Sequence, residues 1–354
     1  MSETGTKILS IGMVSSVGLF AEQNFASVRA GISKIAETSI YDKHFNPFVM
    51  AILPDDVLPA LEPAIENETG LTSRQRRMLR LATLALQEAL AEIPSTEDIP
   101  LFLGVPAPLP ERPNPVNDNF IALLCSQAQK NLNLEKSRLF AEGHTAGLSA
   151  IKAAVDCIAA GEEQCILVGG LDTFLDLYLL ASMDMENRVL SPSVMDGFIP
   201  GEGAAFLLLA QSSNVGGVEL TPLANIVAAS TGFEAGHRYS EEPYKGDGLA
   251  DTFAELFADS DESNKIKTVY AGLNGENFSS KEWGVTFLRN TEHFEENHQF
   301  EHPADCFGDT GAALGAMMTG LAAIGLAKDK TDGPCCVWCS SDYGQRAAVI
   351  LDKA

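Results

Sequence analysis

The chain alternates short apolar runs with longer segments of helical spacing. Short runs bounded by glycine, proline or polar residues predict buried strands, and apolar residues three and four positions apart predict helices. Strands are predicted at 7–18, 100–105, 138–141, 165–168, 220–229, 268–273, 335–340 and 347–351. Helices are predicted at 20–30, 72–93, 120–129, 145–160, 247–257, 282–289 and 311–326. This alternation indicates an α/β protein.

Two of the predicted helices are apolar on every side. Segment 145–160 carries only Lys152 and Asp156 as charged residues, and segment 311–326 carries none. A helix of this kind must be buried all round. Each lies in one half of the chain, and the polar stretch AQSSNVGG reads as a linker between the halves. We therefore predict two similar halves, 1–212 and 213–354, packed back to back.

Composition and charge restrict the class of protein. Of the 354 residues, 45% are hydrophobic and 20% charged, as in ordinary globular proteins, and the formal net charge is −24. Nucleic acids and anionic membranes are therefore disfavoured as partners. The sequence shows no signal peptide and no run of 18 apolar residues. Its seven cysteines lie mostly in apolar runs, which suits a reducing cytoplasm.

The segment 138–172 contains the most suggestive site. A predicted strand ends at Ala141, Gly143 permits a tight turn, and the first apolar helix begins at Thr145. His144 therefore sits at the N-terminus of a buried helix. Backbone N–H groups and the positive end of the helix dipole converge there, which favours chemistry at this position.

These residues also carry a family resemblance. The stretch GHTAGLSAIKAAVDCIAAGEEQCILVGGLD, followed by LSP at 190–192 and GFIPGEGAAFLLL at 197–209, resembles the β-ketoacyl synthases of the thiolase superfamily. The resemblance covers nearly the whole chain. It implies a thiolase-like five-layer α-β-α-β-α fold made of two similar halves.

The resemblance also assigns the active-site positions. The family's nucleophilic cysteine falls on His144, and its two histidines fall on Asn274 in LNGENF and Asp309 in FGDTGAALGA. A family lysine falls on Ala304. These four replacements predict that condensing activity is absent. No cofactor and no metal are expected. The remaining positions assigned to the pocket and oxyanion hole are Gly143, Glu276, Gly308, Tyr343 and Gly344.

Two functions remain open at this stage. The first is a non-catalytic partner, adaptor or chaperone subunit, in a homodimer or in a heterodimer with a thiolase-fold or other protein. An acyl carrier protein or a secretion effector would be its partner. The second is an acyltransferase or thioesterase, in which Asp309 orients His144 as a general base and Asn274 binds a carbonyl oxygen. Purely structural roles are the third interpretation: His144 fills the old pocket, and Asp309 caps its own helix.

Two surface features follow from the family comparison. The resemblance implies a dimer through the strand before His144, and the short segment between Gly104 and His144 implies a reduced pocket. Arg74, Arg76 and Arg77 form the one basic cluster. This cluster reads either as a solvated helix end or as a docking patch for an acidic carrier protein.

Two further clusters have metal-binding residue types. His293, His298 and His302 lie among glutamates, and their interpretation is a solvated acidic loop rather than a metal site. Cys335, Cys336 and Cys339 lie on a predicted strand, which favours reduced core thiols over a structural zinc site.

Overall fold

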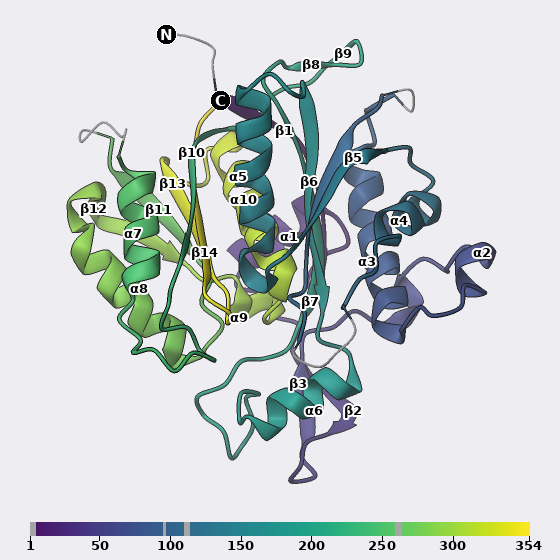
Figure 1. The fold of residues 1–354 in the computed structure, drawn as a ribbon, viewed down its shortest axis with the longest axis vertical. Helices are drawn as coiled ribbons and strands as arrows, with labels where there is room; N and C mark the ends of the chain where they lie inside the picture. The colour runs from purple at the N-terminus through teal and green to yellow at the C-terminus, as the bar shows by residue number, and fades with distance from the viewer. Residues whose placement is uncertain (1–4, 95–96, 110–113, 259–263) are drawn as a thin grey trace.

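The computed structural model describes residues 5–94, 97–109, 114–258 and 264–354 (Figure 1). Its strands are β1 Thr6–Ser15, β2 Ala36–Tyr41, β3 Pro47–Met50, β4 Pro100–Val105, β5 Asn133–Ala141, β6 Cys165–Thr173, β7 Glu202–Ala210, β8 Asn214–Val215, β9 Val218–Glu219, β10 Ala224–Phe233, β11 Ile266–Ala271, β12 Phe294–Glu301, β13 Cys335–Ser340 and β14 Gln345–Asp352. Its α-helices are α1 Ala21–Arg29, α2 Pro63–Glu66, α3 Ser73–Ala89, α4 Phe120–Ala128, α5 Ala146–Ala159, α6 Leu177–Met185, α7 Asp247–Leu256, α8 Asn277–Arg289, α9 Ala304–Phe307 and α10 Leu314–Ala327. Most of the predicted elements are thus present, with shifted ends.

The main sheet repeats one strand order twice. From one edge to the centre the order is β5-β4-β6-β7-β1, and from the other edge it is β12-β11-β13-β14-β10. If only the strands of the main sheet are numbered along each half, both halves have the same order from edge to centre: third, second, fourth, fifth and first. The pairs nearest each edge are parallel and the inner pairs are antiparallel. β1 and β10 join the halves by a short antiparallel pairing. The fold therefore contains an internal repeat, as the sequence pattern predicted. The boundary between 212 and 213 stays a prediction.

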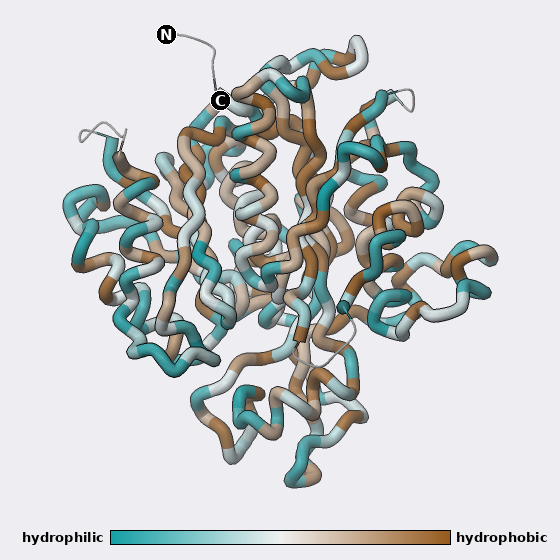
Figure 2. The backbone as a smooth tube through the Cα atoms, in the orientation of Figure 1, coloured by the Kyte–Doolittle hydropathy of each residue, from teal (hydrophilic) through white to brown (hydrophobic). Residues whose placement is uncertain are grey.

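The helices complete five layers, as expected from the family resemblance. The apolar helices α5 and α10 lie between the two halves of the sheet, at the centre of the molecule (Figure 1). Helices α3 and α4 cover the first half, and α7 and α8 cover the second. Figure 2 shows the apolar strands running through the middle and the more polar helices outside. The predicted α-β-α-β-α arrangement is confirmed.

Glycines let the two central helices cross at close range. A Cβ atom on Gly147 would lie 2.9 Å from the backbone nitrogen of Ala316, and one on Gly315 would lie 2.7 Å from Cγ of Leu148. Any larger residue would push α5 and α10 apart. Because both glycines lie in the first turn of their helices, the close crossing brings the two helix N-termini together.

One predicted loop is wrong. The segment around His293, His298 and His302 contains β12, the edge strand of the second half. Phe294 is buried and Phe300 is half-buried, because both pack with Trp283 of α8, whereas the glutamates between them are exposed. This one-sided burial is typical of an edge strand. The high charge of the segment concealed its apolar positions in the sequence.

A small cap lies beside the layers. It consists of β2, β3 and α6, which share their own apolar core with the segment that leads to β7 (Figure 1). The proline-rich stretch 105–119, predicted as a loop, has no helix or strand after Val105 in its described part, and residues 110–113 lie outside the described residues. Among the described residues, no helix combines the length and apolarity needed to cross a bilayer.

Candidate functional site

The candidate site lies where the two central helices begin. β5 ends at Ala141, and Gly143, with a φ of +65°, turns the chain so that His144 enters the short 3-10 turn before α5. In the second half, α9 ends at Phe307, and Asp309 precedes the 3-10 turn Gly311–Ala313 that leads into α10. The internal repeat and the close helix crossing place these two segments face to face.

The structure brings together the three predicted catalytic positions. Nε2 of His144 lies 2.8 Å from both carboxylate oxygens of Asp309. Nδ2 of Asn274 donates to Oδ2 of Asp309 at 2.8 Å, and the backbone N–H of Gly311 donates to Oδ1 at 2.8 Å. Asp309 is 1% exposed, so its charge is neutralised almost entirely by these partners. The predicted N-cap role of Asp309 is wrong, because the N-cap of the 3-10 turn is Thr310 and that of α10 is Ala313.

His144 is positively charged at neutral pH. Burial on its own would lower the pKa of His144, but the adjacent Asp309 carboxylate and the hydrogen bond to it raise that pKa to about 9. The imidazolium in turn lowers the pKa of Asp309, against the effect of burial. The pair is therefore an imidazolium–carboxylate ion pair over the physiological range. A charged imidazole holds no lone pair for a substrate proton, so this state is not that of a general base.

A second group of charges surrounds the pair. Arg188 donates to both oxygens of Glu276 at 2.9 and 2.8 Å and to Asp342 at 2.8 and 3.2 Å. Arg238 donates to Asp342 at 2.9 Å and lies 3.1 Å from Glu276. Asn274 links this group to Asp309, because its Nδ2 also donates to Glu276 at 3.1 Å. We call these seven residues, with His144 and Asp309 included, the ion-pair network.

The ion-pair network balances its charges only when His144 is protonated. It then contains three cations and three carboxylates: His144, Arg188 and Arg238 against Asp309, Glu276 and Asp342. Most of these side chains are largely buried. An uncompensated charge in such surroundings costs several kcal/mol. Charge balance therefore favours the imidazolium, against the effect of burial.

The five predicted pocket positions divide into two groups. Gly143 and Tyr343 line a small cavity beside His144. Gly308 packs against the cap instead, since a Cβ atom there would lie 2.8 Å from the carbonyl oxygen of Ile199. Gly344 packs under Phe233, since a Cβ atom there would lie 2.5 Å from the phenyl ring. Glu276 is held in the ion-pair network. The last three shape the surrounding wall rather than the cavity itself.

The sequence reasoning missed Arg188 and Arg238. Arg188 lies 88 positions before Glu276 and 154 before Asp342. No local spacing signals contacts over such separations. The only available signal was an arginine between two apolar segments, next to the LSP motif, and this also fits an exposed loop.

Both interpretations of the basic cluster at the start of α3 are wrong. Arg77 is buried and pairs with Glu202 through two hydrogen bonds of 2.6 Å. Arg74 pairs with the buried Asp172 at 2.7 Å, and Arg76 donates to three backbone carbonyls. These side chains are neither a solvated helix end nor a free patch for an acidic carrier. The carboxylate partners of Arg74 and Arg77 lie 98 and 125 positions away in sequence, and the carbonyls bound by Arg76 precede α3, so helical spacing could not reveal any of them.

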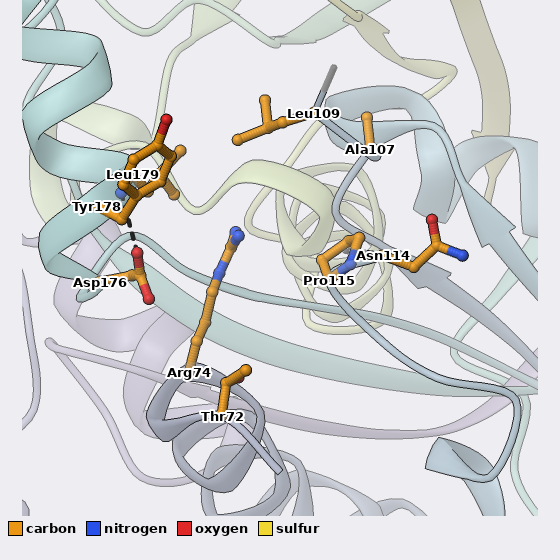
Figure 3. A pocket seen from close by; sticks show the side chains of 9 residues that line it. All are labelled: Thr72, Arg74, Ala107, Leu109, Asn114, Pro115, Asp176, Tyr178 and Leu179. Carbon is orange, nitrogen blue, oxygen red and sulfur yellow. Dashed lines mark hydrogen bonds between the residues drawn. The ribbon is translucent and has the colours of Figure 1, made fainter. Parts of the chain in front are cut away.

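Two adjoining cavities lie at this site, and His144 lines the inner one. The inner one, of about 60 Å³, is lined by His144, Gly143, Asp172, Ser341 and Tyr343 among others. The outer one, of about 220 Å³, lies between α3, α6 and the segment after β4 (Figure 3). Arg74, Ala107, Leu109 and Leu179 line both. Neither cavity reaches the volume of about 300 Å³ that is usual at the lower end for small-molecule sites.

The other residue clusters contain the cysteines of β13 and the histidines around β12. Cys335, Cys336 and Cys339 are buried free thiols on β13, and burial raises the pKa of each. Their interpretation as reduced core is confirmed. His293 stacks on Phe257 and His302 pairs with Asp305. Within the described ranges, no group of three or more histidine, cysteine or acidic side chains could hold a metal ion.

Comparison with known proteins identifies the fold. Residues 143–214 match the family model for the beta-ketoacyl synthase N-terminal domain. This match covers the first central helix, β6, α6 and β7. A comparison with curated protein sequences found no match.

Solved structures share the fold of the entire chain. The ishigamide ketosynthase/chain length factor is 16% identical with a TM-score of 0.78, and all of both chains is covered. The ketosynthase from module 6 of the bacillaene synthase of Bacillus subtilis 168 is 14% identical with a TM-score of 0.77, over 99% of this chain and 72% of that one. A third match is the complex of a ketosynthase with its chain length factor from Xenorhabdus doucetiae. It is 16% identical with a TM-score of 0.74, and the match covers 99% of this chain and 98% of that chain. The chain therefore has the ketosynthase fold, and the predicted resemblance to this family is confirmed.

Proposed function

We propose that this protein is a ketosynthase-like subunit without condensing activity, which acts as a partner, adaptor or chaperone for another protein. The observation that carries the proposal is the state of the nucleophile position. By the family resemblance, His144 takes the place of the nucleophilic cysteine, and its ring is bound to Asp309 in a charge-balanced network. Condensation needs a thiolate that accepts the acyl group. No cysteine is among the described residues that line either cavity.

The partner is expected at the edge of the first half-sheet. β5 is the last strand of the sheet order, so one side of it has no strand neighbour among the described residues. Leu134 on this strand is 49% exposed. An unpaired edge is a template for a further strand. A second copy of the chain, or a related thiolase-fold chain, would pair there. Support comes from the similar ketosynthase that is found in complex with its chain length factor.

Other partners fit the same non-catalytic role. One structural neighbour is described as an acyl-carrier protein in complex with its ketosynthase. For this chain, we expect a carrier protein or a secretion effector to use a site other than the arginines of α3, because Arg74 and Arg77 pair with buried carboxylates and Arg76 donates to backbone carbonyls.

The test is a condensation assay with malonyl and acyl thioesters on coenzyme A and on a carrier protein. Carbon dioxide and free thiol are followed for the wild type and for His144→Ala. We expect both proteins to release carbon dioxide at the rate of a buffer blank. Release above the blank by the wild type, lost in His144→Ala, would contradict the proposal.

A second candidate function is supported by one observation. His144, Asp309 and Asn274 do meet, so an acyltransferase or thioesterase that uses His144 as general base remains an alternative. With a pKa of about 9, only about 1% of this imidazole is neutral at pH 7. Such an enzyme would gain activity about tenfold per pH unit until pH 9. A thioester hydrolysis rate with this profile, abolished by His144→Gln, would favour the alternative over the binding role.

A further inference from the structure

The two adjoining cavities contain hydrogen-bond donors that the protein leaves unused. Arg74 donates through Nε to the carbonyl of Thr173 and through Nη2 to Asp172. Its Nη1 has no acceptor among the described residues. Figure 3 shows its side chain extending from the start of α3 into the middle of the outer pocket, between the Leu179 side and the Leu109 side. One edge of a guanidinium is therefore directed into a cavity.

His144 supplies a second unused donor. Its Nε2 is bound to Asp309, whereas its Nδ1 has no partner in the described parts of the chain. The imidazolium carries a hydrogen on both nitrogens. His144 and Arg74 both line the inner cavity, so two cationic side chains border one small space. Donors on cations bind ionised acceptors about twice as strongly as neutral ones.

The acidic residues around the cavities are already satisfied. Asp172 accepts from Arg74 and from the backbone N–H groups of Thr173 and Ala312. Asp342 accepts from Arg188 and Arg238, and Asp176 caps α6 through the N–H of Leu179. Each carboxylate is thus bound by its own donors, and none of these bonds uses Nη1 of Arg74 or Nδ1 of His144.

Shape and apolar lining indicate the rest of the ligand. The inner and outer cavities, of about 60 and 220 Å³, correspond to about two and about seven waters of liquid. Ala107, Leu109, Pro115 and Leu179 give the outer one apolar walls. The inner space suits a carboxylate group, and the outer one suits a short alkyl chain.

We propose that these cavities bind a small organic carboxylate, with its charged group between Arg74 and His144 and its alkyl tail against Leu109 and Leu179. The ligand class is a free short-chain acid. This inference goes beyond the partner role, and the site needs neither a thiol nor a thioester.

The test is titration calorimetry of the full chain with sodium hexanoate and with hexanamide, which has the same chain and no charge. We expect hexanoate to bind at least about tenfold more tightly, as expected for hydrogen bonds to a charged group. Equal affinity for the two probes, or no heat with hexanoate at millimolar concentration, would overturn the proposal.

Variants locate the site. Leu109→Trp fills the outer pocket and should weaken hexanoate binding by at least about tenfold. Leu288→Trp, the same change at a residue of α8 that is 77% exposed, should leave it unchanged. Arg74→Lys keeps the charge but loses the planar fork, and it should also weaken binding. Thermal unfolding verifies that each variant is folded. Unchanged affinity in Leu109→Trp would place the ligand elsewhere and refute the assignment. Because the assay contains no thioester, its outcome is independent of the condensation assay.

Discussion

Replacing Asp309 by asparagine removes the partner charge of His144 with little change of shape. The pKa of His144 is 6.5 without perturbation and about 9 in the folded chain. A pKa difference of this size corresponds to about 3 kcal/mol of stabilisation, since each pKa unit is worth about 1.4 kcal/mol. In Asp309→Asn, burial and Arg188 both disfavour the imidazolium and Asp342 alone supports it, so the pKa of His144 should fall well below its wild-type value.

The sign of the pH dependence follows from the raised value. A histidine with a higher pKa in the folded state stabilises the fold fully below pH 6.5, and this contribution is lost as the pH rises through 9. The wild type should therefore lose about 3 kcal/mol in unfolding free energy between these limits relative to Asp309→Asn. Asp309 has a lowered pKa, so its own contribution is lost only as the pH falls below its usual range, outside this window.

The assay combines denaturant unfolding at several pH values with NMR titration of the His144 ring. Asp305→Asn is the matched control, because His302 and Asp305 form a similar pair at 2.7 Å that is exposed to solvent. We expect Asp305→Asn to change the free energy of unfolding by less than about 1 kcal/mol at any pH. Titration of His144 near pH 6.5 in the wild type would refute the reasoning, as would parallel stability curves for the wild type and Asp309→Asn.

Four further outcomes follow from the structure. Arg188→Ala should destabilise the fold by about 3–5 kcal/mol in urea unfolding, since Glu276 and Asp342 then share Arg238 as their cationic partner, whereas Arg289→Ala, at an exposed pair, should cost less than about 1 kcal/mol. Gly12→Ala should cost about 3 kcal/mol or reduce soluble yield, because its Cβ atom would lie 1.8 Å from a carbonyl oxygen of α3, and Gly284→Ala, in open space on α8, should stabilise by about 0.5 kcal/mol. Iodoacetamide should not label the three cysteines of β13 in the native protein, as peptide mass mapping would show; rapid labelling would contradict their burial. Light scattering at micromolar concentration should give twice the mass of one chain, and a monomer would count against pairing through β5.

The fold could be predicted from the sequence because its signals are local or repeated. The helix α10 is apolar and buried on every side, as its sequence predicts. The helix α5 is buried over its first turns, but the predicted burial on every side is wrong for it, because Lys152 and Asp156 pair on a side that faces solvent. The glycine turn at Gly143 and the short apolar runs of β6 and β13 mark where the layers connect. β12 was missed because it is charged on its exposed side, so period-two burial could not be recognised in the segment.

The candidate site was predictable only in part. The family pattern assigned His144, Asn274 and Asp309, and the structure brings them within hydrogen-bond distance. Their charge state depends on Arg188 and Arg238, which reach the site from distant parts of the chain. The predictions for the basic cluster of α3 were wrong for the same reason, because each of its arginines has a partner that only the tertiary structure provides. The roles proposed for these residues stay predictions until they are measured.

The most direct test of the central claim is the intact mass of the protein after incubation with acyl-coenzyme A thioesters. A condensing enzyme of this fold must hold its acyl group covalently on the chain. We predict an unchanged mass for the wild type at neutral pH, with the same result for His144→Ala. An acyl adduct on the wild type that His144→Ala abolishes would show that the old pocket still performs acyl transfer, and it would contradict the account.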